Sequence, residues 1–152
     1  MQRYLNLLYS IIVWSAIFIF IKPKRIKELL PVALIAAIVI AVQEAFLIPL
    51  DLHIFNNPFL PIGNVPFFHL VFGAGSGLFM MNYMKKEPSR KALILLLFAI
   101  VITFMAYISN LIACCNLLGK FTIVHNFYQN YLVLCFLTII SEAFLYKRLY
   151  RQ

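Results

Sequence analysis

The sequence predicts an all-α membrane protein, a transmembrane bundle of five helices with its N-terminus outside the cell and its C-terminus in the cytoplasm. Two observations lead to this prediction. Of the 152 residues, 64% are hydrophobic and only 12% are charged, whereas a soluble domain carries about 25% charged residues. Eleven of the thirteen basic residues, moreover, fall in segments that would lie on one side of a membrane.

Each of five hydrophobic runs is long enough to cross a bilayer, which takes about 20 residues of helix, with a range of roughly 17–25. In lipid, backbone polar groups must be bonded within their own segment, so we expect these runs to be helices. They form a single membrane domain that covers residues 1–152. The expected spans are residues 5–21, 29–50, 65–83, 92–114 and 127–146.

The basic residues orient the bundle. Clusters of Lys and Arg lie between spans one and two, between spans three and four, and after span five. The opposite side has only Arg3 and Lys120. Cytoplasmic loops are enriched in Lys and Arg, so this pattern predicts five crossings of a bacterial cytoplasmic membrane. The net charge of +8 is divided among short clusters and forms no continuous basic face, which argues against binding to nucleic acid.

Small residues predict how the second and third spans pack. Ala37 and Ala41 belong to a stripe of alanines with four-residue spacing in span two, and Gly73 and Gly77 form a GxxxG pattern in span three. Stripes of this kind let two helix backbones approach closely in lipid. We therefore expect these four residues to form the contact between the two helices.

Three polar residues mark a candidate site in the outer leaflet: Glu44, His69 and Asn110. At 1.5 Å per residue, Glu44 lies roughly 9 Å below the outer end of its helix and His69 roughly 5–6 Å below the end of the next. An ionisable residue within the membrane suggests a function by default. The plainer interpretation, which we favour about two to one, is that Glu44 and His69 only stabilise helix packing.

The other polar residues predict no chemistry of their own. His53 and Asp51 are expected to be solvated loop residues, or to rim an outer pocket. No HExxH or CxxC spacing predicts a metal site, and no cofactor or catalytic residue is expected. The three cysteines are expected to be buried free thiols that behave as small apolar side chains.

The order of these features resembles small multi-spanning membrane proteins of spore-forming Gram-positive bacteria. The shared features are a first helix that ends in KPKRIKELL (residues 22–30), an outer loop with the pattern PFLP (residues 58–61), and the segment GKFTIVHNF (residues 119–127) before the last helix. The resemblance implies a multi-pass fold in a bacterial membrane. It implies no activity and no site residues.

Three functions are compatible with these observations. The first, which we favour from the sequence, is a non-enzymatic accessory protein that binds membrane lipid and other membrane proteins or itself. The second is a protein that binds or transports a small solute or ion at Glu44, His69 and Asn110. The third is an intramembrane enzyme that uses the pair Glu44 and His69. A polar cavity at these residues would favour the second function, and a dry packed contact would favour the first.

Overall fold

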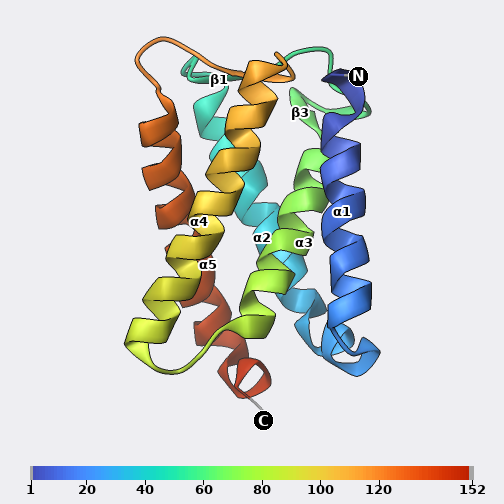
Figure 1. Cartoon of the computed structure of the whole chain (residues 1–152), viewed down its shortest axis with the longest axis vertical. Helices are drawn as coiled ribbons and strands as arrows, with labels where there is room; N and C mark the ends of the chain where they lie inside the picture. The colour runs from blue at the N-terminus through green and yellow to red at the C-terminus, as the bar shows by residue number, and fades with distance from the viewer. Residues whose placement is uncertain (1, 151–152) are drawn as a thin grey trace.

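The computed structural model describes residues 2–150 and is all-helical apart from short loops and strands. Its helices run roughly side by side along the long axis of the molecule (Figure 1). The N-terminus lies at one end of the bundle and the C-terminus near the other. The helices are η1 (Gln2–Tyr4), α1 (Leu5–Phe20), α2 (Pro23–Leu47), α3 (Phe67–Tyr83), α4 (Pro88–Leu111) and α5 (Ile123–Leu149).

The all-helical class predicted from the sequence is confirmed. Within the described chain, α2 and α4 are long and apolar enough to cross a membrane, and α1 is a shorter apolar helix. Helix α2 begins at Pro23, six residues before the predicted span, because proline is favoured in the first turn of a helix. Hydropathy identifies only the apolar part of such a helix. It therefore does not include the basic residues in the first turns of α2.

Two short β-ladders join the loops at the end of the bundle that holds the N-terminus. Strand β1 (His53–Phe55) pairs antiparallel with β4 (Cys115–Leu117), and β2 (Pro61–Ile62) pairs with β3 (Val65–Pro66). The β1–β4 ladder ties the α2–α3 loop to the α4–α5 loop. The spans predicted from the sequence place β1, β2 and β4 in loops and β3 at the start of the third span.

The hydrophobic core is concentrated in the half of the bundle nearest the C-terminus. Its members come from the end of α1, the start of α2, the end of α3, the start of α4 and the end of α5. Leu29, Leu78, Met80 and Met81 have no exposed surface there. The other half has only a small cluster, made by Leu5, Tyr9, Phe72 and Cys114.

Polar contacts join the helices at the same end of the bundle, near the C-terminus. The Arg25 guanidinium donates to the carbonyl oxygens of Arg148 (2.5 Å) and Leu149 (2.6 Å), which lie at the end of α5. Lys91 Nζ lies 2.5 Å from Glu142 Oε1, so the start of α4 is bonded to α5. These contacts link three helices where the basic residues are clustered.

The glycines of α3 allow its close approach to α2, but the partner residues differ from the prediction. A Cβ at Gly77 would lie 2.5 Å from Ala36 Cβ, and one at Gly73 would lie 1.8 Å from Ile40 Cδ1. Ala36 and Ile40 each precede the predicted partners, Ala37 and Ala41, by one position. This corrects the alanine side of the predicted contact. The side chains that face α3 are set by the rotation of α2, which the spacing of alanines does not determine.

We predict that Gly77→Ala destabilises the protein more than Gly73→Ala does. Both changes raise helix propensity by about 1 kcal/mol, so this gain cancels in the comparison. The new methyl at residue 77 meets a Cβ fixed to the α2 backbone, whereas at residue 73 it meets the mobile end of Ile40. We expect Gly77→Ala to lower the free energy of unfolding by about 1–3 kcal/mol relative to Gly73→Ala. Unfolding in mild detergent measures this difference, and equal stabilities would contradict the proposed contact.

Candidate functional site

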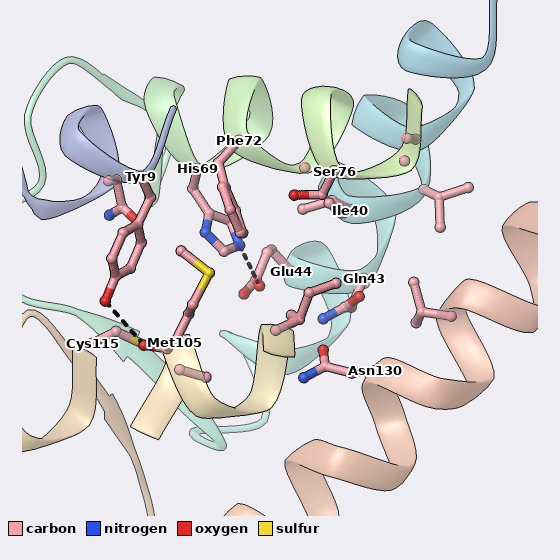
Figure 2. A pocket seen from close by; sticks show the side chains of 18 of the residues that line it. Tyr9, Ile40, Gln43, Glu44, His69, Phe72, Ser76, Met105, Cys115 and Asn130 are labelled. Atoms are coloured by element: carbon pink, nitrogen blue, oxygen red, sulfur yellow. Dashed lines mark hydrogen bonds and ion pairs between the residues drawn. The ribbon is translucent and has the colours of Figure 1, made fainter. Parts of the chain in front are cut away.

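A cavity of about 100 Å³ lies between the helices in the half of the bundle opposite the C-terminus. Liquid water occupies about 30 Å³ per molecule, so the cavity has room for on the order of three waters or one small solute. Polar side chains from all five α-helices line it: Asn6, Gln43, Glu44, His69, Ser76, Ser109, Asn126 and Asn130. Figure 2 shows several of these side chains directed toward the cavity.

The carboxylate of Glu44 is the centre of the site. Only 1% of Glu44 is exposed, and its two oxygens are bonded to different histidines. Oε2 lies 2.6 Å from His53 Nδ1. Oε1 lies 3.2 Å from His69 Nε2, a contact that Figure 2 marks with a dashed line. An ionised carboxylate only accepts hydrogen bonds, so each imidazole donates an N–H to it. A carboxylate offers about four acceptor sites, which leaves about two for another donor or a cation.

His69 is brought to Glu44 as the sequence predicts. It lies in the first turn of α3, where its side chain is 21% exposed. Its ring packs against the ring of Phe55, with the two centroids 4.9 Å apart. The predicted juxtaposition follows from the short connection between the two helices and from the similar depth of the two residues.

His53 is the residue that the sequence analysis misplaced. The prediction that His53 is a solvated loop residue is wrong, because only 8% of it is exposed. The alternative expectation, that His53 rims a pocket, agrees with its place in the cavity lining. Strand β1 directs alternate side chains to opposite faces, so His53 and Phe55 point inward and Ile54 points outward. A strand of three residues is too short for this alternation to be recognised in the sequence.

Cys115 extends the chain of polar contacts from the other side of His53. Its Sγ is in hydrogen-bond contact with His53 Nε2, and the thiol lines the cavity. Burial raises the pKa of the Cys115 thiol, and the charges of Glu44 and Cys114 raise it further. The thiol is therefore protonated near neutral pH, and its S–H donates to Nε2. A continuous relay runs from Cys115 through His53 to Glu44.

Asn110 does not join this site. Its Oδ1 accepts a hydrogen bond from the backbone N–H of Leu117 at 3.1 Å, and its side chain does not line the cavity. Helix α4 ends at Leu111, one residue after Asn110, so the amide stabilises the turn that leads into β4. The expected grouping of acid, imidazole and amide is thus formed with amides other than that of Asn110.

The amides that do line the cavity come from α2 and α5. Gln43 adjoins Glu44, and Asn130 Nδ2 donates to Asn126 Oδ1 (3.0 Å) and to Thr103 Oγ1 (3.1 Å). Asn126 and Asn130 are four residues apart and share one face of α5. This spacing was visible in the sequence and identifies the polar face of that helix.

The charge of the cavity is negative. Within residues 2–150, no Lys or Arg lines it, and Glu44 is the one carboxylate that does. No group of three or more His, Cys, Asp or Glu side chains in this described part is arranged to hold a metal ion. His53 explains this, because it lies between Glu44 and Cys115 and uses one ring nitrogen for each.

No family model matches the chain, and no curated protein or solved structure is significantly similar to it. Fold by itself does not imply function, so a function must be inferred from the chemistry of the cavity. That chemistry consists of a buried carboxylate with unused acceptor capacity, two imidazoles, several amides and one thiol. The arrangement is suited to binding a small cation and to moving a proton between sulfur and imidazole.

We predict that Glu44→Ala destabilises the protein more than His69→Ala. The first change leaves N–H groups of two imidazoles without an acceptor, at a cost of about 1–3 kcal/mol for each buried unpaired group. The second removes one donor from a carboxylate that keeps its bond to His53. Thermal unfolding in detergent measures both effects. Glu28→Ala is the matched control, since Glu28 forms only a surface contact with Arg25, and such pairs contribute about 0–1 kcal/mol. Equal losses for Glu44→Ala and Glu28→Ala would contradict the structural role of Glu44.

Proposed function

We propose that this chain is a multi-pass protein of a bacterial cytoplasmic membrane that crosses the bilayer five times and binds a small cation in the outer half of its bundle. The outward-facing surface of the helices supports a membrane location. Phe18, Phe104 and Phe136 each expose more than half of their surface, among many other large apolar side chains. Soluble proteins rarely expose apolar patches on such a scale.

The dimensions of α1 and the positions of the termini support five crossings. The 16 residues of α1 rise about 24 Å, and the three residues of η1 add about 6 Å, which together match a hydrocarbon core of about 30 Å. The N- and C-termini lie at opposite ends of the bundle, as an odd number of crossings requires (Figure 1). The clustered basic residues at the C-terminal end correspond to the cytoplasmic side.

The observation that carries the binding proposal is the carboxylate of Glu44, which is buried, faces a cavity and retains acceptor capacity. A monovalent cation 4 Å from it would gain about 4 kcal/mol at an effective dielectric constant of 20. Amide oxygens of Gln43, Asn126 and Asn130 provide further neutral ligands. The size of the cavity restricts the ligand to an alkali ion with a water or to a small organic ammonium ion.

A dry packing contact between Glu44 and His69 would favour the accessory role that the sequence indicates. A polar cavity beside the pair favours the solute-binding role instead. Association with lipid, with other membrane proteins or with a second copy stays a prediction of the sequence and is compatible with cation binding. No contact in the described residues distinguishes among such partners.

We predict that methylammonium stabilises the purified protein in a saturable way. A ligand that binds only the folded state raises its stability by about 2.7 kcal/mol at 100 times its Kd. The measurement is thermal unfolding in mild detergent against methylammonium, sodium and potassium chlorides at constant ionic strength. Glu44→Gln should abolish the shift, and Glu28→Gln should retain it. Cation binding at this site is excluded if none of the three ions gives a saturable shift, or if the shift survives in Glu44→Gln.

The five-span topology predicts which engineered cysteines are reached from outside the cell. Asn64→Cys and Lys120→Cys should react with a membrane-impermeant maleimide on intact cells, because both positions lie in exposed outer loops. Lys24→Cys and Lys86→Cys should react only after permeabilisation. The unmodified chain, whose three cysteines are buried or half-buried, measures the background. Labelling of Lys86→Cys on intact cells would contradict the topology.

A further inference from the structure

Three side chains from three separate elements form a linear relay beside the cavity. Glu44 comes from α2, His53 from β1 and Cys115 from β4. His53 stands in the middle, with Nδ1 2.6 Å from Glu44 Oε2 and Nε2 in hydrogen-bond contact with Cys115 Sγ. A nucleophile bonded to a base, with the base oriented by a third group, is the general signature of an activated nucleophile.

The hydrogen-bond pattern assigns a role to each group. Because the Glu44 carboxylate accepts the Nδ1–H of His53, the unprotonated nitrogen is Nε2, which faces the thiol. His53 is therefore in the tautomer that can remove the thiol proton. Burial and neighbouring negative charge raise the pKa of Cys115, so little thiolate exists without a base. The thiol depends on His53 for its nucleophilicity.

The β1–β4 ladder holds the base and the thiol in position. His53 is paired with Leu117 and Phe55 with Cys115, so Cys115 is the diagonal neighbour of His53 on the same face of the ladder. Diagonal partners lie about 7–8 Å apart between backbones, within reach of an imidazole. Backbone pairing, in addition to side-chain packing, thus sets their separation.

Cys115 is also the thiol that a small molecule can reach. It lines the cavity together with His53 and Glu44. Cys114 instead packs in the small apolar cluster with Leu5 and Phe72, and Cys135 packs against the main core. The cavity volume of about 100 Å³ limits an electrophile held entirely within it to a group of acetyl or propionyl size.

We propose that Cys115 is a catalytic nucleophile that accepts a short acyl group from an ester or thioester, with His53 as the general base and Glu44 as a positioning residue. As the bond between Sγ and the carbonyl carbon forms, the thiol proton moves to His53 Nε2. The bond between that carbon and the leaving oxygen or sulfur then breaks, and the leaving group takes the proton from Nε2 as an alcohol or thiol. Water then attacks the thioester carbon while His53 Nε2 takes its proton. The bond between that carbon and Sγ breaks, Sγ takes the proton back from Nε2, and the carboxylic acid is released with the thiol restored.

This activity goes beyond cation binding, although it uses the same cavity for access. The test uses the full chain in mild detergent with p-nitrophenyl acetate as the probe. We expect an initial burst of p-nitrophenolate stoichiometric with protein, followed by slower release as the thioester is hydrolysed. Peptide mass spectrometry of acid-quenched protein should locate an acetyl group on Cys115. Neutral hydroxylamine should remove this group, as expected for a thioester. Absence of the adduct on the folded protein would overturn the proposal.

Matched variants distinguish a thiol that is activated by His53 from one that reacts without the help of a base. Cys115→Ala should form no thioester, whereas Cys135→Ala and Cys114→Ala should react at the rate of the unmodified chain. His53→Gln should slow acylation by about 100-fold, the lower end of the contribution expected from a general base. A His53→Gln variant that folds and reacts as fast as the unmodified chain would overturn the role of His53.

The pH profile of the unmodified chain provides a test that does not depend on how a variant folds. Unassisted attack by a thiolate of raised pKa would increase about tenfold per pH unit between pH 7 and 9. Attack assisted by His53 starts from the protonated thiol, so its rate does not follow the thiolate fraction and we expect a plateau in this range. A tenfold rise per unit would refute the proposal. Cys115→Ala should keep its stabilisation by methylammonium, so failure of acylation and failure of cation binding are distinguished.

Discussion

The buried carboxylate of Glu44 is the constraint on which the half of the bundle opposite the C-terminus depends. An ionised group removed from water must be compensated by hydrogen bonds, since its desolvation costs several kcal/mol even after relaxation. Helix α2 provides none of the donors. They come from His53 in the α2–α3 loop and from His69 at the start of α3. The loop must therefore fold back over the end of the bundle, which brings β1 within reach of β4.

The two halves of the bundle differ in how their interiors are packed. The half nearest the C-terminus is filled by large apolar side chains and is closed by Arg25 and by the contact between Lys91 and Glu142. In the other half, a cavity lies between the helices, and polar side chains from all five α-helices are among the residues that line it. The glycines of α3 join the halves, since Gly73 and Gly77 allow α2 to lie close along this length.

The sequence predicted what depends on composition and local period, and it missed what depends on distant pairing. Hydropathy was sufficient for the helices, and helical depth was sufficient to bring Glu44 to His69. Cys115 and His53 lie 62 positions apart in the sequence and meet through a β-ladder whose strands have three residues each. No local sequence pattern could predict this contact. The prediction also named the wrong residues of α2 at the contact with α3, Ala37 and Ala41 in place of Ala36 and Ile40. The rotation of a helix about its axis depends on all of its neighbours, which the spacing of alanines does not include. Asn110 was misassigned because α4 ends directly after it.

The packed half of the bundle limits how far the cavity extends. Leu29, Leu78, Met80 and Met81 lie below the cavity with no exposed surface, so they form a solid floor. Packed side chains therefore separate the cavity from the end of the bundle that holds the C-terminus. In the proposed five-span topology, this barrier makes the cavity a binding site that is closed toward the cytoplasm.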